Sequence, residues 1–173
     1  MQMHLNVNLY ALASICVTLG PMNKVPNKAV VDAWVGMLRA QKSALEQIEK
    51  TLKNNDLPSL AWYDVLWELE KDDPNGVRPF ELENRLLMPQ YGLSRLLGRI
   101  ESAGYLERIP CKEDGRGQLL LITRSGKKIR RRMWPVYGNA VNDAVGEHLT
   151  RNEAKTLAAL MRKLIEHSDI RPI

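Results

Sequence analysis

Cysteine and histidine are scarce in this chain, with two and three copies in 173 residues. Cys16 and Cys111 lie far apart, and His4, His148 and His167 are scattered. A transition-metal site needs such ligands at short, regular spacings, and no nucleophile–base pair or phosphate-binding loop stands out either. We therefore predict no catalytic residues, no metal and no cofactor, and a chain that is not an enzyme. Two unpaired, reduced thiols are typical of a cytoplasmic protein.

Long apolar runs are also lacking. The most apolar stretch, residues 5–19, is too short to cross a bilayer, and Asn6 and Asn8 interrupt it. No Lys or Arg precedes it, so it makes a poor signal peptide, although that alternative stays open. Because Met22 opens a sequence that reads like an ordinary N-terminus, we interpret residues 1–21 as an N-terminal extension with a low structural role. We predict no membrane partner.

Positive charge, by contrast, is concentrated in one block. The chain is 45% hydrophobic and 26% charged, which is enough to build a core, and its net charge is +5. Residues 78–132 hold 13 Lys and Arg against 6 Asp and Glu, whereas residues 1–77 hold 7 against 9 and residues 133–173 hold 5 against 5. The central block therefore carries the whole positive excess, which favours a polyanionic partner.

Helical periodicity dominates both flanks of this block. Apolar residues recur at spacings of three, four or seven over residues 27–53, after Thr123 and again after Thr150, and such spacing indicates amphipathic helices. Residues 58–70 are apolar around most of the helix surface, which predicts a buried central helix. Pro135 should kink or split the helix after Thr123. Thr150 and Glu153 have the spacing of a capping box that begins the last helix.

The central block changes its pattern twice. Two short helices, residues 80–87 and 89–103, are separated by a tight link, which predicts a helix-turn-helix whose second helix fits a major groove. Gly104 ends that helix as a C-terminal cap. Residues 105–110 and 118–122 read as strands joined by an Asp-Gly turn. The predicted fold is mostly α with a small β-hairpin wing, that is, a winged helix-turn-helix.

Polar side chains on the second helix and on the hairpin suit DNA. The predicted outward face of the helix holds Gln90, Tyr91, Ser94, Arg95 and Arg99. Gln can pair with adenine and Arg with guanine, while Ser and Tyr can reach phosphates or base edges. Lys112 and Arg116 at the hairpin tip suit a minor groove or a flanking phosphate. Asp114 could pair with Arg116 and orient it.

The order of these motifs resembles the multiple-antibiotic-resistance regulator (MarR) family. Residues 93–108, LSRLLGRIESAGYLER, are followed by DGRG at 114–117 and by LITRSG at 121–126. The family pattern is roughly R-L-x-x-R-L-E-x-x-G, then D-x-R, then L-T-x-x-G. By position, Ser94 and Arg95 fall in the recognition helix of that family, and Asp114 and Arg116 fall in its wing. Pro89 departs from the pattern, which commonly has a small polar residue there.

The resemblance implies an organisation and a function. Residues 22–57 would form an N-terminal dimerisation helix, residues 58–124 the winged helix-turn-helix domain that binds DNA, and residues 125–173 the C-terminal dimerisation helices. The chain would bind a pseudo-palindromic operator on double-stranded DNA as a homodimer. It would act as a repressor that responds to a small phenolic or lipophilic effector, held between the DNA-binding and dimerisation regions. The alternative is a winged-helix interaction module that binds an acidic protein.

Several residues allow a structural interpretation beside the functional one. Arg99 and Arg108 could pair with Glu101 or Glu107 instead of contacting DNA. The run of three arginines at residues 130–132 could touch the DNA backbone, but a solvated helix face is the favoured interpretation.

The tryptophans and one cysteine also allow both a functional and a structural interpretation. The tryptophans could line an effector pocket, although core or dimer interface is favoured. They are Trp34, Trp62, Trp67 and Trp134. Cys111 beside the wing could be an oxidation switch, but an inert thiol is favoured.

Overall fold

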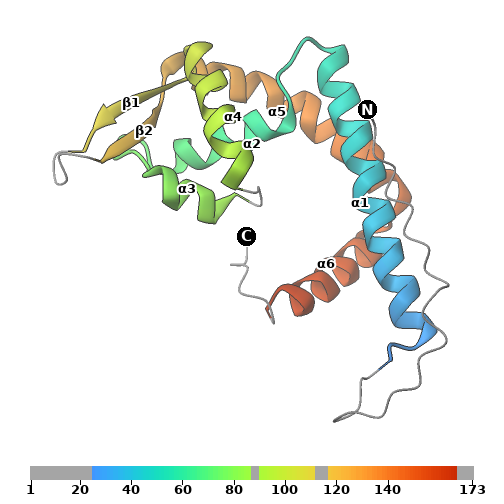
Figure 1. The fold of residues 1–173 in the computed structure, drawn as a ribbon. Helices are drawn as coiled ribbons and strands as arrows, with labels where there is room; N and C mark the ends of the chain where they lie inside the picture. The colour runs from blue at the N-terminus through green and yellow to red at the C-terminus, as the bar shows by residue number, and fades with distance from the viewer. Residues whose placement is uncertain (1–24, 87–89, 112–116, 167–173) are drawn as a thin grey trace, which may run out of the picture. The chain divides into compact units, whose positions relative to one another are not determined.

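The computed structural model describes residues 25–86, 90–111 and 117–166, and the chain divides into two compact units, Met1–Gly36 and Met37–Ile173. Six α-helices, one 3-10 turn and a two-stranded hairpin make up the described residues (Figure 1). Their order is α1 (Lys28–Asn54), α2 (Leu60–Lys71), α3 (Pro79–Arg85), α4 (Gln90–Ser102), β1 (Leu106–Pro110), β2 (Gln118–Ile122), α5 (Arg124–Ala144), η1 (Gly146–His148) and α6 (Arg151–Ile165). The predicted fold class, mostly α with a winged helix-turn-helix, is confirmed.

Helix α2 lies at the centre of the larger unit, as its apolar surface predicts. It packs against α3, α5 and β2, and Val65 and Leu66 are fully buried in a single core. The helix begins at Leu60 and not at Pro58. Its first N–H is satisfied from another helix, because the Leu60 N–H donates to Oε1 of Glu49 on α1 at 3.0 Å. A cap supplied across the fold in this way leaves no local sequence signal.

The helix-turn-helix consists of α3 and α4, and the link between them lies outside the described residues. The Arg78 N–H donates to the Glu81 carboxylate at 3.2 Å and so caps the start of α3. Helix α4 ends as predicted at Gly104, whose φ of 73° is left-handed. The Tyr105 N–H returns to the Ile100 carbonyl at 3.1 Å, which satisfies an end carbonyl and turns the chain into the wing.

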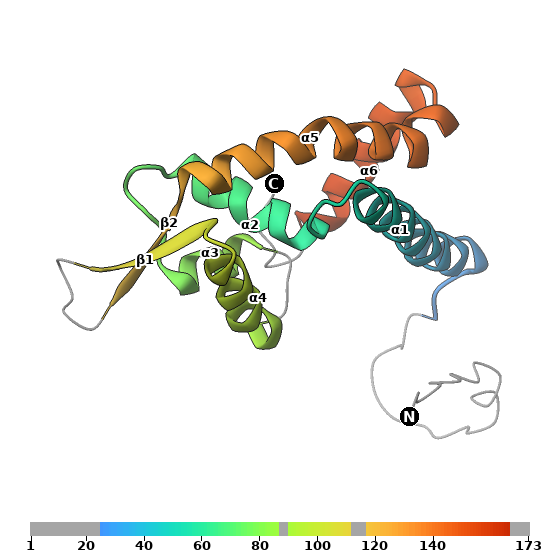
Figure 2. The same ribbon diagram turned by 90° about the horizontal axis from the view of Figure 1, so that it is seen from above.

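The wing is an antiparallel hairpin whose register runs from Leu106 opposite Ile122 to Pro110 opposite Gln118. Figure 2 shows it extending away from the helices. Val77, just before α3, adds a third short partner, because it exchanges two backbone hydrogen bonds with Leu120 at 3.0 and 2.9 Å. The sequence gives no sign of this bridge, since a single residue pair leaves no alternating pattern.

Helices α5 and α6 form the C-terminal part. Helix α5 continues through Pro135, so of the two predicted outcomes, a kink or a split, the split does not occur. Pro135 and Arg131, four residues earlier, are both exposed, and the carbonyl that loses its partner can therefore meet water. The predicted capping box begins α6, where the Thr150 N–H donates to Oε2 of Glu153 at 2.8 Å. Within the described ranges, no helix combines the length and apolarity needed to cross a membrane.

Candidate nucleic-acid interface

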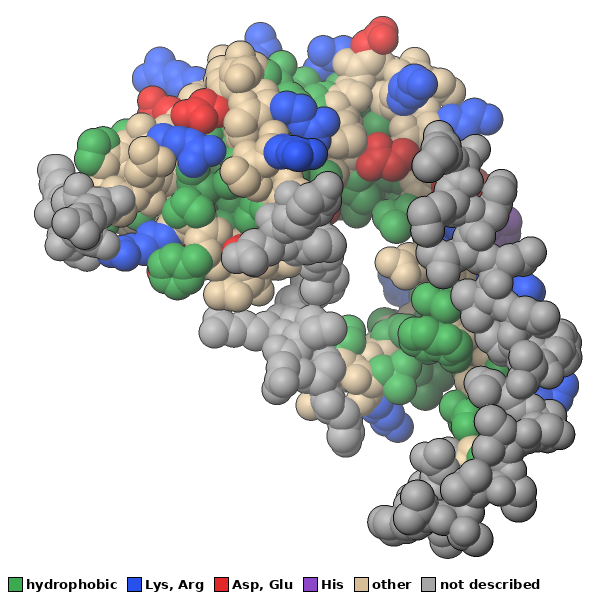
Figure 3. Space-filling model, in the orientation of Figure 1, with side chains coloured by type: hydrophobic (Ala, Val, Ile, Leu, Met, Phe, Trp, Pro, Cys, Tyr) green, Lys and Arg blue, Asp and Glu red, His purple; other side chains and the backbone are tan. Residues whose placement is uncertain are grey.

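Helix α4 has one buried side and one exposed side. Its buried residues, which anchor it on the core, are Leu93, Leu96, Leu97 and Ile100. Their spacing follows the helical period, so the polar positions between them must face away from the core. Ser94, Arg95 and Arg99 are exposed accordingly. Figure 3 shows Lys and Arg side chains standing out over this part of the molecule.

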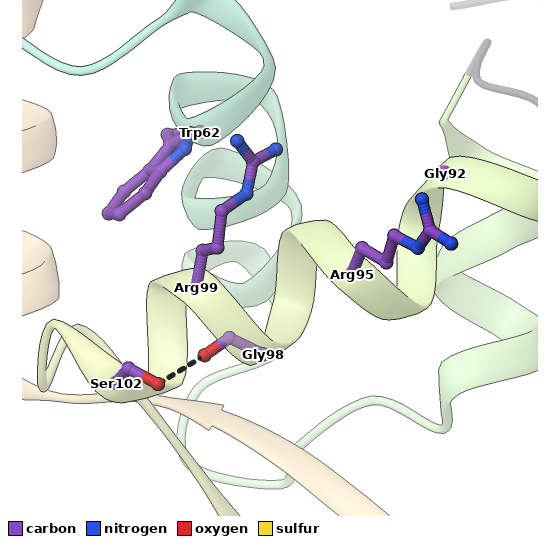
Figure 4. A pocket seen from close by; sticks show the side chains of 6 residues that line it. All are labelled: Trp62, Gly92, Arg95, Gly98, Arg99 and Ser102. Carbon is purple, nitrogen blue, oxygen red and sulfur yellow. Dashed lines mark hydrogen bonds between the residues drawn. The ribbon is translucent and has the colours of Figure 1, made fainter.

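The exposed side of α4 is an open hollow of about 1040 Å³ (Figure 4). Arg95 and Arg99, one turn apart, extend from the same side of the helix, and Gly98 leaves the surface between them low. The Ser102 hydroxyl donates to the Gly98 carbonyl at 2.8 Å. The open hollow therefore presents two guanidinium groups, which suit contact with an anionic, grooved partner.

Trp62 of α2 borders the same hollow beside Arg99 (Figure 4). It is partly buried and packs edge-on against Tyr105, with 5.9 Å between the ring centroids. No local pattern in the sequence predicts that Trp62 lies near the recognition helix. Its position in a helix 30 residues before α4 gave no signal that the two would meet.

The structure brings together part of the predicted site. Ser94, Arg95 and Arg99 share the exposed side of α4. Gln90 and Tyr91 lie in its first turn, but their side chains are outside the described part of the structure. The wing-tip residues Lys112, Asp114 and Arg116 also lie outside the described residues. β1 and β2 on either side hold the ends of that tip, because the Cys111 N–H donates to the Gly117 carbonyl at 2.8 Å.

Arg108 and Arg99 differ in role. Arg108 forms the structural pair that the sequence allowed, with 2.9 Å between its Nε and Oε2 of Glu101, and it thereby ties β1 to α4. Arg99 forms no such pair with Glu101 or Glu107 within the described residues. Its guanidinium faces the hollow, so the DNA-facing interpretation fits Arg99 better than the structural one.

The arginine run on α5 corrects an expectation. Arg130 does not belong to a solvated helix face: its side chain is 11% exposed and pairs with the Glu70 carboxylate. Arg131 reaches the same carboxylate at 3.3 Å, and only its own side chain and that of Arg132 are exposed. The run therefore braces α5 against α2 through Arg130.

Cys111 is buried, and Nη2 of Arg78 lies 3.5 Å from its Sγ. Burial limits access of oxidants to this thiol, in line with the favoured interpretation.

Known proteins of one family resemble this chain in sequence and in fold. A model of the MarR family matches residues 56–117, from the start of α2 into the wing. A MarR-family transcriptional regulator from Streptomyces coelicolor, solved in complex with DNA, superposes with a TM-score of 0.75 at 25% identity, over 86% of this chain and 95% of that one. The chain is thus similar to the MarR family in sequence over residues 56–117 and in fold over most of its length.

Two further relatives match this chain in sequence over different lengths. An uncharacterised helix-turn-helix transcriptional regulator of Bacillus anthracis is 28% identical over 136 residues, or 79% of this chain and 88% of the relative. The multiple antibiotic resistance protein MarR of Escherichia coli is 30% identical over 89 residues, or 51% of this chain and 62% of that protein. The Bacillus and Streptomyces relatives are transcriptional regulators, in agreement with the prediction that this chain is not an enzyme.

Proposed function

We propose that this regulator binds duplex DNA as a homodimer, with α4 in the major groove and the hairpin wing alongside. The observation that carries the proposal is the exposed pair Arg95 and Arg99 on a helix whose other side is fixed in the core. The central positive excess adds the long-range attraction that a phosphate backbone requires. The related regulator solved with DNA supports the same role here.

The proposed contacts follow from position on the helix. Ser94 and Arg95 lie near the N-terminal end of α4, where side chains of a recognition helix first reach base edges. Gln90 and Tyr91 precede them and are the further candidates for base or phosphate contacts. Arg99, a turn later, is assigned to phosphate. At the wing, we assign Lys112 and Arg116 to the minor groove or its phosphates, and Asp114 to orienting Arg116.

Uncovered apolar residues support assembly into a dimer. Helix α6 has no buried residue, and its leucines Leu157, Leu160 and Leu164 are 41, 51 and 56% exposed. Helix α1 likewise exposes Trp34 and Leu38. Figure 3 shows hydrophobic side chains open to view over α6. Apolar surfaces of this kind mark interfaces, and a twofold contact between copies buries the same patch on each.

Repression and effector response complete the proposal. A dimer seated on a pseudo-palindromic promoter site blocks that site, and its place of action is the cytoplasm. A small effector that prefers the dimer with the wrong spacing of its two recognition helices would weaken DNA binding by its differential affinity for that state. Residues 22–57 and 125–173 are the proposed dimerisation segments, and residues 58–124 the DNA-binding domain.

Selection from random duplexes, followed by binding at two salt concentrations, tests the proposal. We expect enrichment of an inverted repeat, and a steep loss of affinity as salt rises. Sedimentation should give a dimer, and Leu160→Glu should yield monomer or aggregate. Absence of any complex with generic duplex at low salt would favour the alternative, a module that binds an acidic protein.

A further inference from the structure

A cavity of about 760 Å³ opens between α2, the end of α3 and α5. Four aromatic residues form a continuous cluster along it. The Tyr63 ring lies 6.4 Å from that of Trp67, 6.2 Å from that of Trp134 and 5.0 Å from that of Tyr137, centroid to centroid. Trp134 is 56% exposed, so part of its ring is open to a ligand. The cavity therefore offers electron-rich ring faces.

The positive charges that line this cavity are already neutralised. Lys71 pairs with Glu68 at 2.6 Å, Arg85 pairs with Asp72, and Arg130 pairs with Glu70. Lys71 and Arg130 also lie over the Trp67 ring. An anionic ligand would have to displace a carboxylate from one of these pairs before it gained a cation.

The carboxylate of Asp64, unlike these cations, has no neutralising partner among the described residues. It lines the cavity, is partly buried, and pairs with no cation within the described part of the chain. Its pKa is raised to about 6, first by burial and then by the nearby charges of Glu68 and Glu49. The pKa of Tyr137 is also raised, first by burial and then by the charge of Asp64, which indicates that this charge is felt among the rings. The uncompensated charge in the cavity is therefore negative.

We propose that the cavity binds an amphipathic organic cation, with Asp64 as its counter-ion and the rings of Trp134, Tyr63 and Tyr137 as its walls. A bound cation gains both the ring faces and the carboxylate, in a site that excludes part of the water. A phenolate or carboxylate ligand meets the charge of Asp64 instead and is repelled. Only the role of this cation as the effector rests on the proposed function. An organic cation differs in class from the phenolic or lipophilic effector that the resemblance implies.

Two hydrophobic ions of the same shape and opposite charge test the site. Titration of the full chain without DNA, followed by tryptophan fluorescence and calorimetry, compares tetraphenylphosphonium with tetraphenylborate. We expect the cation to bind at least about tenfold more tightly. Equal affinity for the two ions, or tighter binding of tetraphenylborate, would overturn the proposal.

Variants locate the site. Asp64→Asn should weaken phosphonium binding by about tenfold and leave borate binding unchanged or improved, because only the counter-ion is lost. Asp143→Asn removes the same charge from an exposed position on α5 and should change neither. Trp134→Ala should weaken both ions, since it removes a wall. Phosphonium binding that is indifferent to Asp64→Asn would place the ion elsewhere and refute the proposal.

Measurements of DNA binding test the cavity assignment separately from the proposed DNA-binding role. Ligand-free protein and the Asp64→Asn variant should bind the selected operator equally, and the phosphonium ion should release only the unsubstituted protein at low concentration. A chain that prefers the cation but binds no duplex would retain the cavity assignment and refute the DNA-binding role. A chain that binds its operator but shows no preference for the cation would support the DNA-binding role and refute the cavity assignment.

Discussion

The guanidinium of Arg130 lies over the indole of Trp67, with 4.8 Å between its central carbon and the ring centroid. Its Nε donates to the Glu70 carboxylate at the same time, so a single side chain of α5 holds two residues of α2. Lys127, one turn earlier on α5, pairs with Asp73 just beyond α2. The bracing of α5 against α2 is thus partly ionic and partly aromatic.

Replacement of Arg130 by Met should therefore act on stability. The variant leaves Glu70 with Arg131 alone and removes the cation over Trp67, for a loss of about 2–3 kcal/mol in unfolding free energy. Arg131→Met is the matched control, because Arg131 shares the carboxylate but its side chain is 69% exposed, and it should cost no more than about 0.5 kcal/mol. Urea denaturation measures both. Equal losses in the two variants would contradict the bracing role.

Gly126 marks a close approach at the start of α5. A Cβ built there would lie 2.1 Å from the Tyr105 carbonyl oxygen, which already accepts the Thr123 N–H at 3.1 Å. Gly126→Ala must shift backbone in the wing and should cost about 2–4 kcal/mol. Gly138→Ala on the same helix meets only ordinary contacts at 4.0 Å and should be neutral or stabilising. Thermal melting compares the two variants. Similar melting temperatures would show that the wing backbone can shift without loss of stability.

The raised pKa of Asp64 gives stability a defined dependence on pH. An acid whose pKa rises from 3.8 to about 6 on folding binds its proton more tightly in the folded state. Its stabilising contribution is complete below the unfolded value and is lost as pH rises through 6. Asp64→Asn should consequently melt higher than the unsubstituted chain at pH 8, and the difference should shrink between pH 6 and 4. A difference that is constant with pH would mean that folding does not raise the pKa of Asp64. Asp143→Asn, at an exposed position on α5, is the control variant.

The sequence predicts what depends on local pattern and misses what depends on contact across the fold. The apolar spacing of α4 predicts which side carries Arg95 and Arg99, and the Thr150–Glu153 box predicts the start of α6. Nothing local to the arginine run reveals that Arg130 meets Glu70, because the partner lies 60 residues away. The place of Trp62 beside α4 was missed for the same reason.

Arg95 tests how sequence is read. A base contact predicts that changing its base pair costs about 1–3 kcal/mol and that Arg95→Ala erases this penalty. A phosphate contact predicts equal weakening on matched and mismatched duplexes, with a salt slope lower by about one unit. Anisotropy titrations of both duplexes at two salt concentrations separate the cases. We expect the base-reading result, and an equal loss on both duplexes would assign Arg95 to positioning.

Gly98 tests whether DNA approaches α4 closely. Among the described residues, nothing apart from the adjoining helix backbone lies within 4 Å of a Cβ placed there, so folding of this part does not require glycine at the position. Gly98→Ala should raise the unfolding free energy by about 0.5–1 kcal/mol, because alanine is the better helix former. The added methyl stands in the hollow between Arg95 and Ser102, where the groove edge would sit, and should weaken operator binding by about tenfold. Gly138→Ala serves as control, since it makes the same change on a helix that the proposal does not assign to DNA. A Gly98→Ala protein that melts higher and binds its operator as before would mean that this side of α4 never meets the duplex closely, and the recognition surface would then have to lie nearer the first turn of the helix.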